Sequence, residues 1–411
     1  MEICHRNASA YKTTCHVAIA SISLPRTEGL LKELISTNWD TRVQMQAIPS
    51  ASQVRSELSV FAKPETKRGL IIFIADMSLY IVSIAVVLFA PWIWAKLAAG
   101  IFAGVKISNL VTIGHDAAHN CLTSSRTLNK FIAIVSFTPA LFNYRLWLYD
   151  HHNLHHQKTN QVKHNAHAPL SKKEFEALTQ WEKSKQRFYR SSSLWAFGVY
   201  YIVERWLSVH LFPQPDMPDS VRKGGWPHTF YLLAYLTGFL ALLIAAPQFS
   251  ETSSLAAILF GFVVPFYVFQ SLFSFTIYVQ HTNPRVAWFK DKPDRNGNGR
   301  QDQVSVQLVF PKWFSHLDLA IYEHGAHHVQ PAIPLYRLRE AQEKLNSLLG
   351  RYAVTDKFSF SWLKQVQDRC KLYDFENHQW LDFEGRPTSR ITLTSEMDLA
   401  RPVWAVHAGK P

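Results

Sequence analysis

Four long apolar blocks dominate the pattern of hydrophobic and polar residues along this chain of 411 residues. The blocks occupy about residues 69–90, 93–113, 229–246 and 255–279. Each is close to the ~20 residues that a helix needs to cross a bilayer, and only short turns at Pro91 and Pro247 separate the members of each pair. The pattern therefore predicts an all-α integral membrane protein with four transmembrane helices in two hairpins.

The charged residues indicate which way the hairpins face. The net charge is +12, and almost all Lys and Arg residues lie in the N-terminal, middle and C-terminal regions outside the blocks. Basic residues gather on the cytosolic side of membrane proteins, so we expect both termini and the middle region there. We find no signal-peptide pattern, and the four scattered cysteines favour a reducing compartment. We expect a multi-pass protein of a bacterial inner membrane, and without a compact basic stripe no nucleic-acid partner is expected.

Two of the blocks continue beyond the membrane on this cytosolic side. A helix from Ile93 to His119 would be about 40 Å long, which exceeds the hydrocarbon core by about 10 Å. The fourth block likewise carries His281 at its end. The apolar stretches at 131–149 and 194–212 are interrupted by Pro or charged residues, so we interpret them as interfacial or re-entrant. Together these features predict a cytosolic helical cap that carries the histidines.

The same pattern divides the chain into three parts. Residues 1–56 are expected to form an N-terminal cytosolic extension, and residues 349–411 a C-terminal cytosolic cap. Residues 57–348 hold the four spans and all of the histidine motifs.

Three short histidine-rich boxes are the strongest chemical signal in the sequence. In a helix, the spacing of the second box, residues 150–156, places three imidazoles on one face, at i, i+3 and i+4. His151 is also one turn from His155, but we favour His152 as the ligand. The candidate metal ligands and catalytic residues are His115, His119, His152, His155, His156, His281, His324, His327 and His328.

The composition of the boxes restricts the metal. Imidazole suits Fe, Zn, Cu and Ni, and nine histidines are enough for two ions. No box contains a cysteine, which argues against a closed structural zinc site. Two oxygen-activating irons fit best, and the predominance of His over Glu separates the chain from the carboxylate di-iron bundles. The remaining histidines, including His164, His167 and His210, are expected to have no ligand role.

The boxes resemble those of the membrane fatty acid desaturases, the histidine-box di-iron family. The motifs that carry this resemblance are residues 115–119 (HDAAH), 152–156 (HNLHH) with Thr159 and Asn160, 280–282 (QHT) and 323–328 (EHGAHH). Residues 331–338 (PAIPLYRL) resemble the bacterial Δ12 or ω-6 acyl desaturases in particular. The resemblance covers about residues 57–348, which would then be the desaturase domain.

Membership of this family would imply a definite chemistry. Nine histidines would hold two non-haem irons beside a bent acyl tunnel, and O2 would serve as oxidant. The enzyme would insert a cis double bond into a long acyl chain, linked to lipid, CoA or acyl carrier protein. Because no donor domain is evident in the sequence, electrons would come from a separate protein such as ferredoxin or cytochrome b5.

Other functions are compatible with the same boxes. Hydroxylation, acetylenation, terminal-alkene formation and carotenoid ketolation would use the same iron site, because the outcome depends on tunnel geometry. A metal-binding membrane receptor or transporter would instead need ionisable residues along several spans. The blocks contain only Asp76 and Lys106 well inside them, which disfavours that class. These two residues either form an ion pair, or Lys106 snorkels to the interface while a hydroxyl holds Asp76.

Overall fold

The computed structural model describes residues 49–290, 304–311, 313–314 and 319–392. The chain divides into two compact units, Met1–Ala47 and Ile48–Pro411, and the first lies outside the described residues. Most of the expected N-terminal extension and the end of the expected C-terminal cap therefore also lie outside them. Helix α2 (Ala51–Leu58) opens the second unit, and Glu57 forms an ion pair with Lys344 at 3.0 Å.

The four predicted spans are confirmed among the described residues. They are α3 (Thr66–Phe89), α4 (Ile93–Ala118), α10 (Asp219–Ile244) and the continuous helical stretch Ser254–His281. The last comprises α11 (Ser254–Ile258), a π-helical turn η6 (Leu259–Val263) and α12 (Val264–His281). Helix α10 starts well before its apolar block and contains Pro227. The short connections at residues 90–92 and 245–253 confirm the arrangement as two hairpins.

Close packing between α4 and the last span brings two of the histidine-bearing helix ends together. An ideal Cβ on Gly100 would lie 2.4 Å from the Phe260 carbonyl oxygen, and one on Gly104 would lie 2.6 Å from Val268 Cβ. Only glycine permits this approach, as at many interfaces between membrane helices. Because the two helices run in contact, their ends bring His115 and His281 to the wall of the same cavity.

The ion pair between the first two spans is also confirmed. Lys106 Nζ lies 2.6 Å from Asp76 Oδ1, and both side chains are less than a tenth exposed. Asn109 Nδ2 donates a second hydrogen bond to the same oxygen at 3.0 Å. The carboxylate of α3 is therefore held from α4 rather than by a hydroxyl of its own helix.

The middle region forms shorter helices and no further span among the described residues. Its elements are α5 (Arg126–Phe137), α6 (Tyr144–Leu148), η2 (Tyr149–His155), η3 (Val162–His164), α7 (Lys172–Glu176), α8 (Gln180–Tyr189), α9 (Trp195–Tyr201) and η4 (Ile202–Leu211). Trp195, Val203 and Leu207 follow one another at helical spacing and are exposed. This apolar stripe supports the interfacial interpretation of the stretch 194–212.

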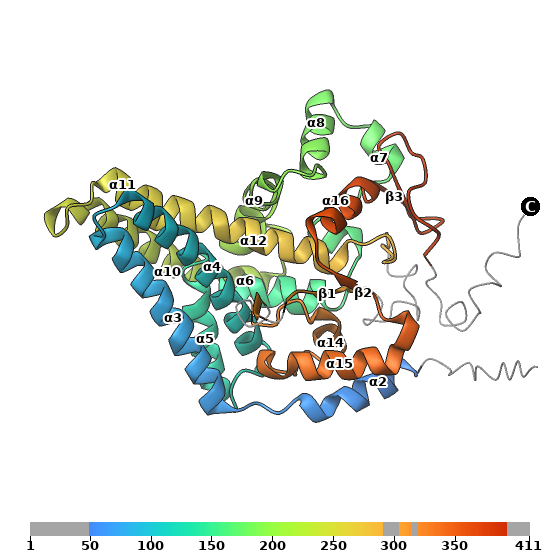
Figure 1. Cartoon of the computed structure of the whole chain (residues 1–411), viewed down its shortest axis with the longest axis horizontal. Coiled ribbons are helices and arrows are strands. Elements are labelled where there is room, and N and C mark those ends of the chain that lie inside the picture. Colours follow the sequence, from blue (N-terminus) through green and yellow to red (C-terminus); the bar gives the residue numbers. More distant parts are fainter. Residues whose placement is uncertain (1–48, 291–303, 312, 315–318, 393–411) are drawn as a thin grey trace, which may run out of the picture. The chain divides into compact units, whose positions relative to one another are not determined.

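The C-terminal part covers the histidine end of the membrane helices (Figure 1). It contains α14 (His324–Val329), α15 (Leu338–Leu349), α16 (Phe360–Arg369), β1 (Gln307–Val309), β2 (Thr355–Lys357), β3 (Leu372–Asp374) and β4 (Gln379–Leu381). Strands β1 and β2 pair in parallel, with Gln307 opposite Thr355, and β3 and β4 pair antiparallel. Besides η3, the short 3-10 turns among the described residues are η1 (Ser59–Phe61), η5 (Ala246–Gln248), η8 (Leu335–Arg337) and η9 (Gly350–Tyr352).

Helix α15 fixes α14 in place. Its buried side chains Ala341 and Leu345 belong to the same apolar core as Ala326 of α14. The Gln342 side chain also accepts a hydrogen bond from the Ala326 amide at 2.8 Å. The third histidine box is therefore supported from the cap and not from the membrane helices alone.

Candidate metal centre

The first box lies where α4 leaves the membrane-spanning part. His115 is in the last turn of α4, and His119 is the residue that caps it. Asp116 is 1% exposed, and its carboxylate bonds His115 Nδ1 at 2.9 Å and the Leu335 amide of the cap. This contact orients the imidazole of His115, so that Nε2 is the nitrogen left to face the site.

The second box departs from the expected α-helix. Residues Tyr149–His155 form a π-helix, η2, in which residues five apart share a face. His151 and His156 therefore meet, with their Nε2 atoms 3.0 Å apart. His152 lies nearby, with its ring centroid 4.2 Å from that of His119. The wider winding explains why the i, i+4 pairing of His152 with His156 is not observed.

The third box joins the second box and α12. Nε2 of His324 lies 3.0 Å from Nε2 of His281 and 2.8 Å from Nε2 of His328. His328 Nε2 in turn lies 3.2 Å from His155 Nε2. Four imidazoles from three separate elements thus direct their Nε2 atoms to one point.

The imidazoles form two groups that could each hold a metal ion, and within each group the ligand atoms lie within 4.8 Å of one another. The first group contains His115, His119, His151, His156 and His327; the second contains His155, His281, His324 and His328. Eight of the nine predicted residues are in these groups. His151 is present where His152 was favoured, and His152 belongs to neither group.

Hydrogen bonds from outside the groups orient several of the rings. His155 Nδ1 pairs with Asn165 Oδ1 at 2.9 Å, and His281 Nδ1 with the Val304 carbonyl at 3.0 Å. Metal-ligating histidines commonly donate their second ring N–H to such partners. Sequence reasoning did not identify these partners. Asp116 was recognisable as the neighbour of His115 in the first box, whereas Asn165 and Val304 come from loops without a motif.

Burial favours the neutral form, which binds metals, for imidazoles of the second and third boxes. Desolvation, followed by the nearby histidines, lowers the pKa of His324, His327 and His328 well below the usual value. Burial and His115 lower the pKa of His152 to about 4. Neutral imidazole is the ligating form, so the donor set fits a transition metal.

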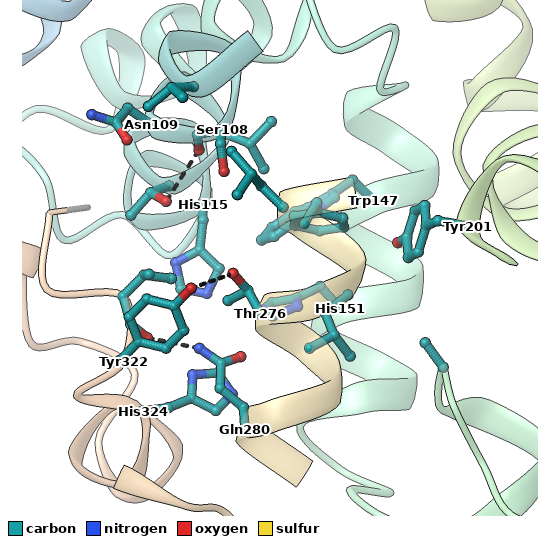
Figure 2. A pocket seen from close by; sticks show the side chains of 18 of the residues that line it. Ser108, Asn109, His115, Trp147, His151, Tyr201, Thr276, Gln280, Tyr322 and His324 are labelled. Carbon is teal, nitrogen blue, oxygen red and sulfur yellow. Dashed lines mark hydrogen bonds between the residues drawn. The ribbon is translucent and has the colours of Figure 1, made fainter. Parts of the chain in front are cut away.

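A cavity of about 460 Å³ leads to both groups (Figure 2). Side chains of α4 and α12, including Val111, Phe273 and Ile277, provide apolar walls. Beside His324, Tyr322 and Thr276 share a hydrogen bond of 3.2 Å (Figure 2). An apolar cavity with few polar groups near the histidines suits a long hydrophobic substrate.

The part of the wall formed by α6, η2, α9 and η4 is more polar. Tyr201 Oη and His210 Nε2 lie 2.6 Å apart, and Arg205 Nη2 lies 3.4 Å from Asp150 Oδ1. All four residues line the cavity. His210, expected to have no ligand role, is buried and lies outside both groups. No spacing in the sequence indicated that these side chains would reach the cavity.

Membrane-spanning helices, two histidine groups that could hold metal ions and an adjoining apolar cavity together define a membrane protein with a candidate metal site. The family model for fatty acid desaturases matches residues 71–359. The chain therefore belongs to the fatty acid desaturase family, and it is a membrane fatty acid desaturase.

Individual relatives agree with this assignment and confirm the resemblance to the Δ12 or ω-6 type. The chloroplastic omega-6 fatty acid desaturase of Spinacia oleracea is 26% identical over 326 residues, covering 79% of this chain and 69% of that protein. The corresponding Glycine max protein is 27% identical over 288 residues, covering 70% of this chain and 64% of that protein. The sn-1 oleoyl-lipid 12-desaturase of Synechocystis sp. is 26% identical over 298 residues, covering 71% and 79%.

Proposed function

We propose that this desaturase binds two iron ions, one in each histidine group, and inserts a cis double bond at the Δ12 or ω-6 position of a lipid-linked oleoyl chain. The observation that carries the proposal is the position of the two imidazole groups against the wall of the apolar cavity. The names of the relatives support the position of the bond and the lipid-linked substrate.

The proposed ligands are the eight histidines that the sequence predicted and that also belong to the two histidine groups of the structure. A ninth ligand comes from the second box. We retain His152 as the ninth ligand. Its Nε2 is buried without a hydrogen-bond partner among the described residues, and its ring centroid lies 4.2 Å from that of His119. A small change in the winding of η2 would exchange the two rings.

When bound, the irons would supply the power to oxidise an unactivated CH2 group, using O2 and electrons from a separate donor such as ferredoxin or cytochrome b5. The residues of this chain orient the metal ligands and position the substrate. Asp116, Asn165 and the Val304 carbonyl hold the imidazole rings. Phe273 and Ile277 exclude water and align the acyl chain, so that one pair of carbons faces the histidines.

The site is proposed to face the cytosol of a bacterial inner membrane. The basic residues Lys63, Lys67 and Arg68 precede or open α3, at the end of the helix where the cap lies. The opposite connections are short, and the basic bias thus favours a cytosolic cap. A cytosolic face would also make the site accessible to a soluble electron donor.

Expression in a host that makes oleoyl lipids but no diunsaturated chains tests the activity. We expect a new double bond, which gas chromatography and mass spectrometry of the lipids would locate. The His327→Ala variant should accumulate in the membrane without forming the product. A hydroxylated, acetylenic or terminal-alkene product would support an alternative outcome at the same site, and unchanged lipids would contradict the proposal.

Iron content tests the metal and the ninth ligand. Protein purified without oxygen should contain about two irons per chain, and one iron at full loading would contradict the two-metal proposal. His152→Ala should lose iron, while His151→Ala should retain more of it. The reverse order would assign the ninth position to His151. Both variants should be compared at equal protein, with identical elution on size exclusion as the control for folding.

A further inference from the structure

The cavity beside the histidine groups reaches the surface of the protein at apolar side chains. Among the described residues that line it, only Leu79, Phe102 and Trp313 are exposed, with exposed fractions of 42%, 42% and 66%. Leu79 belongs to α3 and Phe102 to α4, whereas Trp313 lies between β1 and α14 of the cap. Two of the three exposed lining residues are therefore on membrane-spanning helices.

These two residues lie at the same depth in the membrane. Asp76 of α3 pairs with Lys106 of the antiparallel α4. Leu79 follows Asp76 by about one turn, and Phe102 precedes Lys106 by about one turn. Phe102 is nine positions from Ile93, which corresponds to about 14 Å along the axis and to about the middle of a ~30 Å hydrocarbon core. At that depth the surroundings of the protein are the acyl chains of lipids.

The opening extends along α4 and closes towards the histidines. Phe102, Val105 and Ser108 line the cavity at helical spacing, and the last two are partly exposed. Thr112 and His115 also line it, but they are only 7% and 8% exposed. The cavity is thus open to lipid along its membrane half and enclosed where the histidine groups lie.

The charges along the wall offer no site for a phosphorylated acyl carrier such as CoA, whose phosphates proteins bind with free basic side chains. Lys106 and Arg205 are the lysine and arginine residues of the described lining. Lys106 pairs with Asp76 at 2.6 Å. Arg205 pairs with Asp150 at 3.4 Å. The opening therefore fits an uncharged hydrocarbon chain better than a soluble carrier.

Entry from the side also keeps the acyl chain in apolar surroundings. Lipid hydrocarbon and the cavity walls formed by Phe273 and Ile277 are both apolar, so little free energy is lost when the chain moves between them. Entry through the cap would instead expose the chain to water, which is unfavourable for every CH2 group. Because the opening runs along α4, the polar headgroup can stay at the membrane surface.

We propose that the slit lined by Leu79, Phe102, Val105 and Ser108 is a lateral entrance, through which the acyl chain of a bilayer lipid passes from the membrane into the cavity. The substrate is then a resident lipid of the membrane, and no soluble thioester carrier has to deliver it. This inference rests on the proposed desaturase activity and adds to it the route by which the substrate reaches the site.

A bulky adduct in the slit tests the lateral entrance. In a chain with Cys4 and Cys15 replaced by serine, Phe102→Cys is reacted with N-pyrenylmaleimide. The protein is then placed in phosphatidylcholine vesicles that contain a phospholipid with a photoreactive diazirine on its acyl chain. Without the adduct, we expect cross-links at Val111 and Thr112, which line the cavity and are 3% and 7% exposed. The adduct should remove most of these cross-links.

The matched control is Ile101→Cys with the same adduct. Ile101 is 44% exposed and precedes Phe102 on α4, but it does not line the cavity. Cys121 and Cys370 are buried and stay in both proteins. The control adduct should leave the cross-links in the cavity unchanged. Equal loss from both adducts would overturn the proposal, because it would reflect a general disturbance of α4. Undiminished cross-linking with the adduct at position 102 would overturn it as well.

Product formation separates this inference from the proposed activity. Cross-linking needs no turnover, so it decides the entrance independently of catalysis. If wild-type protein with an electron donor forms no double bond in oleoyl phosphatidylcholine, the proposed activity fails and the cross-links still test the entrance. If wild type is active, the adduct on Phe102→Cys should abolish most of the product and the adduct on Ile101→Cys should not. Undiminished product with the adduct on Phe102→Cys would refute the lateral entrance.

Discussion

A double-mutant cycle on Asp76 and Lys106 measures how strongly the first two spans are coupled. Lys106→Met leaves a buried carboxylate with Asn109 as its remaining named partner, and Asp76→Leu leaves a buried ammonium. Breaking a buried pair from one side typically costs ~3–5 kcal/mol. Replacing both members by apolar residues removes both charges, so we expect a cost of only ~1–2 kcal/mol, mainly from the lost hydrogen bond of Asn109.

Thermal unfolding in detergent provides the assay. At ~2–4 °C for each kcal/mol, the single variants should lower Tm by roughly 6–20 °C and the double variant by roughly 2–8 °C. Asn109→Leu serves as the control, because it removes the hydrogen bond from Asn109 to Asp76 and leaves the ion pair in place. The reasoning is refuted if the double variant loses as much as the two single variants together, since independent sites add.

Three further predictions address packing, metal retention and topology. Gly104→Leu should lower the free energy of unfolding by ~1–3 kcal/mol or more, because the new side chain would overpack against α12. The control is Gly238→Leu, which should leave Tm nearly unchanged, because a Cβ at Gly238 would meet nothing within 4 Å among the described residues. Equal effects of the two substitutions would contradict the packing argument. Asn165→Ala should weaken iron retention against a chelator by about 10–100-fold, because Nδ1 of His155 loses its hydrogen bond to Asn165, and full retention would exclude that role. A cysteine at Trp92 should be labelled only from outside the cell, and labelling from the cytosol would invert the topology.

The sequence alone determined the spans and the histidine clusters. A helix in hydrocarbon must satisfy its own backbone and present about 20 apolar residues, whatever its neighbours are, so α3 and α4 are visible as blocks. The boxes are visible for a similar reason, because a metal site that takes several ligands from one helix requires them at short spacing. Both signals depend on local geometry, which a linear pattern records.

Tertiary structure decided the features that depend on how elements rotate and wind. The sequence of the two spans shows that each contains one ionisable residue, Asp76 or Lys106, which needs a partner inside the membrane. Only the rotation of α3 and α4 about their axes determined that these two side chains meet. The π-helical winding of η2 brings His151 rather than His152 against His156, and a residue pattern does not distinguish it from an α-helix.

The partners of the imidazoles depend on even longer connections. Asn165 reaches His155 from a loop, and the Val304 carbonyl reaches His281 across 23 positions of the chain. A backbone carbonyl has no residue type to recognise, and a single Asn occurs too often to be informative. The sequence therefore indicated which histidines are candidate metal ligands, whereas chain folding determined which atoms hold their rings in place, because those contacts join segments with no fixed spacing.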